Sequence, residues 1–82
     1  MSLIFEDTID FDPKTDDAII WADAPDGSRF RVRVTPDYIF RHWSPRGRLR
    51  SAHEEAMRAH LDELKAQAEA AHKAGAAELN LE

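Results

Sequence analysis

The chain has 82 residues, a net charge of −5 and no cysteine. This length suffices for one domain at most, and the lack of cysteine excludes disulfides and cysteine-liganded metal sites. No segment has the roughly 18 apolar residues of a membrane helix, and small secreted domains usually carry disulfides, so we expect a cytoplasmic protein that does not engage a membrane.

The N-terminal segment predicts one or two short edge strands followed by a turn. Residues 3–5 are apolar, and Ile9 and Phe11 follow among acids. Residues 12–17 are Asp-Pro-Lys-Thr-Asp-Asp. This composition is typical of a turn, because proline presets φ and aspartate hydrogen-bonds to neighbouring backbone.

The strongest local pattern predicts a β-hairpin of residues 18–23 and 29–35. The second of these segments alternates arginine with apolar residues, the period of two of a half-buried strand. In the loop between them, Pro25 and Asp26 suit the central positions of a type I turn, and Gly27 suits the left-handed position that follows.

This loop predicts a register and therefore two faces. One face would pair Asp23 with Arg29, Trp21 with Arg31 and Ile19 with Arg33. The other face would collect Ala18, Ile20, Ala22, Phe30, Val32 and Val34. Since the second face is apolar throughout, we expect it to be the core side.

A short helix is predicted to follow the hairpin directly, over residues 36–43. Thr35 offers a hydroxyl N-cap, Pro36 suits the first helical position, and Asp37 places an acid in the first turn.

A long helix is predicted over residues 52–74. Ser51 and Glu54 have the spacing of a capping box, and Gly75 supplies a C-terminal stop. Residues 76–82 are predicted to be a frayed tail.

The apolar stripe of this long helix is narrow: Met57, Leu61, Leu64, Ala68 and Ala71. A helix of this length spans about 35 Å, whereas the strands span about 23 Å. We therefore expect an overhang of about two turns, which is either solvated or packed on a second copy.

Together these elements predict an α+β fold in a single domain, residues 1–82. A two- or three-stranded antiparallel β-meander (about residues 2–35) would pack against the short helix and the long C-terminal helix. The expected core is Phe5, Ile20, Phe30, Val32, Val34, Ile39, Trp43, Met57, Leu61 and Leu64.

Charge is distributed in three blocks along the chain. Residues 1–28 carry eight acids and one lysine, residues 29–50 carry seven arginines and one acid, and residues 51–82 carry seven acids and three basic residues. The basic block contains two candidate contact sites. The arginine row on the second strand is Arg29, Arg31 and Arg33, opposite Trp21; the arginine loop, residues 44–50, adds Arg46, Arg48 and Arg50.

Three explanations of the arginines stay open. They pair with the acidic flanks of the same chain, they form a protein or self-interface, or they bind nucleic acid through guanidinium–phosphate contacts and stacking on Trp21. The position of the acids of residues 6–17 relative to the arginine row would distinguish internal pairing from a free cationic surface.

No catalytic, metal or cofactor motif is present. His53 and His60 are seven residues apart, about 10 Å of helical rise, which is too far for one ion. We expect His53, His60 and His72 on the surface or flank of the long helix, and His42 to pack beside Trp43. Without cysteine, a serine elbow or a glycine-rich loop, we expect no catalytic residue, no metal and no cofactor.

The order of elements resembles a family of small uncharacterised bacterial proteins, a domain of unknown function with a β-meander followed by C-terminal helices. The resemblance covers about residues 3–65 and depends on Asp26-Gly27, the alternating strand and the entry into a helix at Thr35-Pro36-Asp37. It implies the fold and assigns no activity. We therefore expect a non-catalytic protein-interaction module that binds a protein partner or forms a homodimer, with weak nucleic-acid or other anion binding as the alternative.

Overall fold

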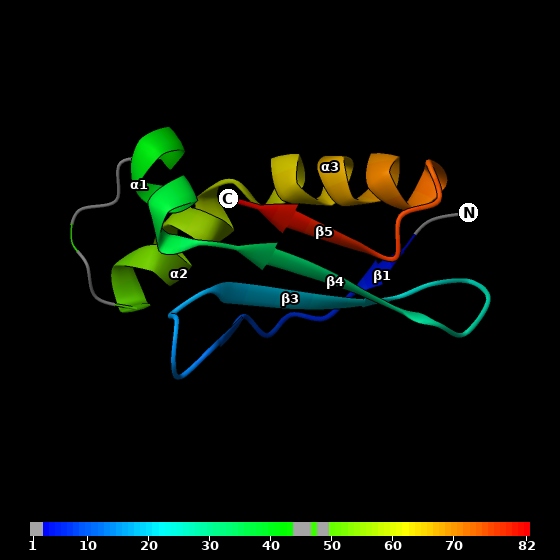
Figure 1. The fold of residues 1–82 in the computed structure, drawn as a ribbon, viewed down its shortest axis with the longest axis horizontal. Helices are drawn as coiled ribbons and strands as arrows, with labels where there is room; N and C mark the ends of the chain where they lie inside the picture. Colours follow the sequence, from blue (N-terminus) through cyan, green and yellow to red (C-terminus); the bar gives the residue numbers. More distant parts are fainter. Residues whose placement is uncertain (1–2, 44–46, 48–49) are drawn as a thin grey trace.

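One mixed β-sheet carries α3 on one face and has α1 and α2 packed at its end (Figure 1). The computed structural model describes residues 3–43, 47 and 50–82. Its elements are β1 (Ile4–Phe5), β2 (Asp10–Phe11), β3 (Ala18–Asp23), β4 (Arg29–Val34), α1 (Pro36–Trp43), α2 (Arg50–Ala59), α3 (Leu61–Lys73) and β5 (Glu78–Leu81). The fold is therefore α+β, as the sequence predicts.

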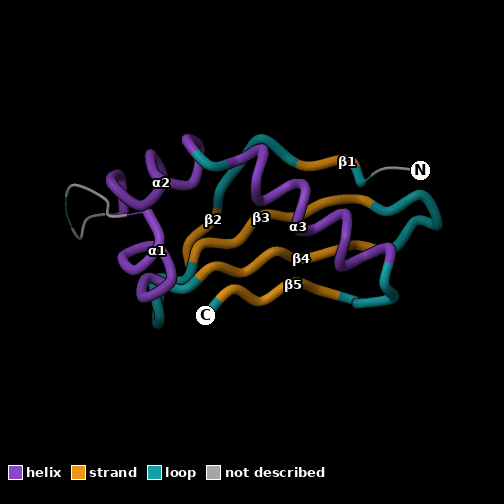
Figure 2. Tube along the Cα trace, turned by 90° about the horizontal axis from the view of Figure 1, so that it is seen from above, coloured by secondary structure: helices purple, strands orange, loops and turns teal. Residues whose placement is uncertain are grey.

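The sheet has β3 and β4 at its centre and two unlike edges (Figure 2). β1 and β2 both pair antiparallel with β3 and form one edge. β5 pairs parallel with β4 and forms the other edge. A parallel neighbour requires a crossover connection, which the three helices supply.

The predicted hairpin and its register are confirmed. Asp23 lies opposite Arg29, Trp21 opposite Arg31 and Ile19 opposite Arg33. Gly27 has φ +89°, and its N–H donates to the carbonyl of Ala24 (3.0 Å). This is the left-handed position for which glycine is the favoured residue.

The N-terminal edge is more irregular than a meander strand. The registers of β1 and β2 on β3, Ile4 opposite Asp23 and Asp10 opposite Ile19, show that the segment between them holds two residues more than a regular ladder. The turn that follows is as predicted, with Oδ1 of Asp12 accepting from the N–H of Lys14 (2.7 Å). Leu3 and Ile9, from this segment, are buried in the core.

The predicted first helix is confirmed as α1. The N–H of Tyr38 donates to Oγ1 of Thr35 (3.2 Å), which is the expected hydroxyl cap. Ile39 is fully buried on the helix face that contacts the sheet end.

The single helix predicted over residues 52–74 is wrong, because it is broken into α2 and α3 at His60 (φ −112°, ψ 21°). The break lets Met57 fill the core at the sheet end while Leu64 fills the core under α3. The predicted capping box is also absent, because α2 begins at Arg50 and contains Ser51.

The predicted overhang does not form either. After the break, α3 runs over the sheet rather than past it (Figures 1 and 2). Ala68 is fully buried and Ala71 packs against the core, because small side chains allow a helix to approach a sheet closely.

The frayed tail predicted for residues 76–82 is wrong, since most of it forms β5. Gly75 (φ +96°) donates to the carbonyl of His72 (3.0 Å), and Ala76 donates to that of Ala71 (3.0 Å). This Schellman motif confirms the predicted glycine stop and turns the chain back toward β4. Leu79 and Leu81 then pack on the core beside Val32 and Val34.

The predicted core is largely confirmed. Seven of its ten members are the largest fully buried side chains: Phe30, Ile20, Ile39, Met57, Leu64, Val32 and Val34. The other three, Phe5, Trp43 and Leu61, are half-buried against them.

Candidate interaction surface

The side of the sheet opposite α3 carries the candidate site. We call it the open face; it consists of side chains that alternate along the strands with those of the core. Its members are Ile4, Asp10, Ile19, Trp21, Asp23, Arg29, Arg31, Arg33, Glu78 and Asn80. The structure thus brings the whole arginine row and Trp21 together, as the hairpin register predicts.

Arg29 is held by two carboxylates and an aromatic ring. It pairs with Glu6, which lies in the irregular segment after β1, and with Asp23 (3.3 Å). Its guanidinium lies 5.1 Å from the ring centroid of Trp21. The cation–π partner of Trp21 is therefore its diagonal neighbour Arg29. The register places Arg31, not Arg29, directly opposite Trp21.

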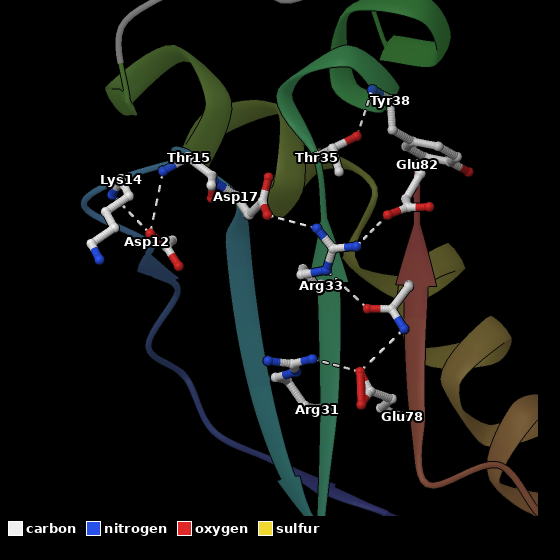
Figure 3. Close-up of polar contacts among 11 residues, drawn as sticks. Asp12, Lys14, Thr15, Asp17, Arg31, Arg33, Thr35, Tyr38, Glu78 and Glu82 are labelled. Carbon is white, nitrogen blue, oxygen red and sulfur yellow. Dashed lines mark hydrogen bonds and ion pairs between the residues drawn. The ribbon is translucent and has the colours of Figure 1, made fainter.

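Arg31 and Arg33 are held by β5 and by the turn before β3 (Figure 3). Arg31 donates to Glu78 (2.5 Å). Arg33 donates to Asp17 (2.7 Å) and also to Glu82. Asp17 is only 7% exposed, and its hydrogen bond is the main cause that raises the pKa of Arg33 above its usual value. Of the five carboxylates that pair with the row, Asp17 has the least exposed side chain.

Asn80 completes this network. Its side-chain oxygen accepts from Nε of Arg33 (2.9 Å), and its amide donates to Glu78 (3.1 Å). The hydrogen bond from Arg31, followed by that from Asn80, holds the pKa of Glu78 below its ordinary value of 4.5.

The arginine row is therefore neutralised within the chain. Three guanidinium groups face five partner carboxylates, those of Glu6, Asp17, Asp23, Glu78 and Glu82, so +3 and −5 leave a charge of −2. Glu6 and Asp17 come from the N-terminal acidic segment, where the sequence suggested that partners could lie. Glu78 and Glu82 were missed because the C-terminal segment was predicted to be frayed.

The arginine loop is described only in part. Arg46 and Arg48 lie outside the described residues. Arg50 opens α2, pairs with Asp16 (2.8 Å) and lies 6.0 Å from the ring centroid of Phe11. The one described arginine of this loop is thus engaged with the turn at residues 12–17.

Apolar side chains remain on the open face. Ile4 is 72% exposed and is the one large apolar side chain classed as exposed among the residues that the structure describes. Trp21 and Ile19 are half-buried along β3. Carboxylates and guanidiniums surround this apolar stripe, which is the arrangement of a small interface with a polar rim.

The histidines pack against aromatic rings. His53 is buried, edge-on to Phe40 (5.4 Å between centroids), so its predicted surface or flank position is wrong. His60 stacks on Trp43 (4.7 Å), and His72 meets the ring of Phe30 edge-on (5.6 Å). The fourth, His42, lies 4.2 Å from the ring of Tyr38. The contacts of His53 and His60 join the α2–α3 region to α1, that of His72 joins α3 to β4, and that of His42 lies within α1.

Three further features concern the part of the chain that the structure describes. Among residues 3–43, 47 and 50–82, no three metal-ligating side chains gather in a cluster. A shallow recess beside α2 is lined by Ser51, Glu54, Glu55 and Arg58, but Glu54 is paired with Arg58 (3.1 Å). No described helix combines the length and apolar character needed to cross a bilayer.

Comparison with known proteins adds nothing to this geometry. The chain matches no family model, no curated protein and no solved structure. Function has to be inferred from the surface itself.

The Glu78 pairing predicts an acid-sensitive contribution to stability. A carboxyl group whose folded pKa is depressed stabilises the fold above its ordinary value, here 4.5, and that contribution is lost as pH falls through the folded pKa. We expect Glu78→Gln to lose less stability than the unmodified protein between about pH 5 and pH 3. Urea unfolding midpoints of both proteins across this pH range measure the difference.

The matched control for this experiment is Glu55→Gln, on the exposed side of α2. It should follow the unmodified protein across the range. If Glu78→Gln follows the same pH profile as Glu55→Gln, the pairing of Glu78 with Arg31 does not contribute to the acid sensitivity of the fold.

Proposed function

We propose that this chain is a non-catalytic, cytoplasmic protein-interaction module that binds a protein partner through its sheet. One observation carries the proposal: the open face combines an apolar stripe with an arginine row whose charge the chain itself neutralises. Such a face has the composition of a protein interface rather than that of a phosphate-binding surface.

The neutralised arginine row argues against nucleic-acid binding at this face. Phosphate contacts draw their affinity from free cations that replace condensed counterions. A phosphate here would have to displace carboxylates that outnumber the guanidiniums by five to three. The alternative anion-binding function therefore depends on Arg46 and Arg48 of the arginine loop.

The same charge balance favours a different protein over a second copy on the open face. Two copies placed face to face would bring together two surfaces on which carboxylates outnumber guanidiniums, and like charges across an interface are unfavourable. A partner with a basic rim around an apolar contact would be complementary. A concentration-dependent mass in light scattering would instead favour the homodimer.

Site-specific photo-crosslinking tests the interaction directly. We expect a photoreactive phenylalanine at position 21 to form discrete heteromeric adducts in the source cells, and excess unlabelled protein to compete them away. The same group at the exposed Ala66, on α3, is the matched control and should form none. Equal adducts from both positions, or none from position 21, would contradict the proposal.

Removing carboxylates that pair with the arginine row should give the open face an affinity for nucleic acid. Glu78→Gln combined with Glu82→Gln leaves three acids against the three guanidiniums, so the local charge rises from −2 to 0 and Arg31 is released. We expect the double variant to gain weak, salt-steep affinity for a fluorescent oligonucleotide, while the unmodified protein shows none by anisotropy at low salt.

Glu55→Gln combined with Asp62→Asn is the matched control, because it makes the same change in net charge at two exposed positions of α2 and α3. Its affinity should stay that of the unmodified protein. Tight binding by the unmodified protein would favour the anion-binding function. An equal gain in the control would show that net charge, and not release of Arg31, is responsible.

A further inference from the structure

At the outer edge of β5, backbone groups point away from β4 and no described strand pairs with them. The carbonyl of Leu81 accepts from the N–H of Thr35 (3.0 Å), so the N–H and C=O groups of Leu79 and Leu81 face β4. Backbone groups alternate in direction along a strand, so those of Glu78 and Asn80 face outward. β5 ends the sheet, and no described element lies along its outer side (Figure 2).

The inner edge of β5 already recognises one kind of strand. β4 alternates arginine with apolar residues. Arg31 and Arg33 bond to Glu78 and Asn80 on the open face (2.5 and 2.9 Å). Val32 and Val34 lie beside Leu79 and Leu81 on the helix side. The charged and apolar sides of β5 therefore match such a strand on both faces of the sheet.

The same side chains remain accessible to a strand on the outer side. The side chain of Glu78 is 41% exposed and that of Glu82 is 67% exposed. Around them, Arg31 and Arg33 face Asp17, Glu78 and Glu82, so two positive charges meet three negative ones. Each carboxylate can accept more than one hydrogen bond. A further cation beside β5 is thus favoured. β5 also lacks the lysine, proline or bulge with which edge strands avoid pairing.

We propose that the outer edge of β5 binds an extended protein segment in which arginine or lysine alternates with apolar residues, and that this segment adds a strand to the sheet. The inference rests on the proposed function and names the chemistry of the partner. Main-chain hydrogen bonds would supply affinity, and the alternating side chains would supply specificity.

A second copy fits this edge less well. A two-fold antiparallel pair built on the outward backbone groups would place Glu78 opposite Glu82 of the other copy when it is centred on Asn80, and opposite Asn80 when it is centred on Leu79. In either register the second β5 brings carboxylates and no cation to the edge. Like charges directly opposite one another on paired strands are destabilising. The edge therefore favours a basic segment over a homodimer.

A peptide with the sequence of residues 29–35 and blocked ends serves as the probe, because it has the pattern that β5 already binds. We expect it to shift the backbone amide resonances of Glu78 and Asn80 in the isotopically labelled full chain and to slow their hydrogen exchange. A peptide with glutamate in place of each arginine should do neither. Equal effects of both peptides, or no effect of the arginine peptide, would overturn the proposal.

Two substitutions at position 80 distinguish binding through backbone hydrogen bonds from binding through the side chain of Asn80. Asn80→Pro removes the outward N–H, which an edge strand tolerates, whereas Asn80→Ala removes the side chain and keeps the N–H. We expect Asn80→Pro to weaken peptide binding by at least about tenfold and Asn80→Ala by less than about threefold. Equal losses would overturn pairing at this edge.

Two controls complete the experiment. If Asn80→Pro does not fold, the double variant Glu78→Gln and Glu82→Gln replaces it and should weaken binding of the arginine peptide. If the unmodified chain self-associates and Asn80→Pro abolishes this self-association, the occupant of the edge is a second copy and the proposal of a basic segment is overturned. If the arginine peptide does not bind but position 21 still yields heteromeric adducts, the edge site alone is refuted. If the peptide does not bind and position 21 yields no adducts, the proposed function is refuted as well.

Discussion

Replacing Phe30 by alanine is expected to lower the free energy of unfolding by about 3–5 kcal/mol. Phe30 is 1% exposed and is the largest of the fully buried side chains. Its ring also meets His72 of α3 edge-on (5.6 Å), so its loss opens a cavity between the sheet and that helix. Domains of this size have a total stability of only about 5–10 kcal/mol, so the variant should be close to unfolded at physiological temperature.

Urea unfolding followed by circular dichroism measures this loss. Phe11→Ala is the matched control, because Phe11 is half-buried at the β2 edge. Its loss should be about 1–2 kcal/mol, since less apolar area leaves water. Equal losses at positions 11 and 30 would contradict the assignment of Phe30 to the centre of the core.

Deleting residues 78–82 is the second change with a large expected effect. It removes the pairing of β5 with β4, the packing of Leu79 and Leu81 against the core, and the carboxylates on Arg31 and Arg33. Partial burial of two leucines and several ladder hydrogen bonds together contribute roughly 3–5 kcal/mol. We expect loss of cooperative unfolding or a correspondingly lower urea midpoint.

This deletion also distinguishes the two interpretations of the C-terminal segment. A frayed tail would change stability by less than about 0.5 kcal/mol when removed. The control is deletion of Glu82 alone, which keeps the β5 ladder and removes one exposed carboxylate. A full deletion that behaves like this control would show that β5 does not stabilise the domain.

The hairpin and the first helix could be predicted from sequence because their determinants are local. Pro25, Asp26 and Gly27 specify one turn, and that turn specifies which residues face one another across β3 and β4. Thr35 and Pro36 likewise specify where α1 begins. In each case the decisive contacts lie within a few residues of one another along the chain.

The helix break at His60 and the strand β5 could not be predicted in this way. Residues 52–74 have high helix propensity, so local preference does not predict a break. The break follows from tertiary packing, because Met57 is buried at the end of the sheet and Leu64 is buried on its face. β5 has four residues and no β-branched side chain, which makes a weak strand signal. It is ordered by β4, more than forty residues earlier.

The charge pattern shows the same division. Composition places seven arginines between residues 29 and 50, and the hairpin register puts three of them on one face. Whether Arg33 is free depends on Asp17 and Glu82, which adjoin it in space but lie 16 and 49 residues away along the chain. Local backbone preferences determine the row; its neutralisation and the free edge beside it follow from long-range pairing, which only the folded chain brings about.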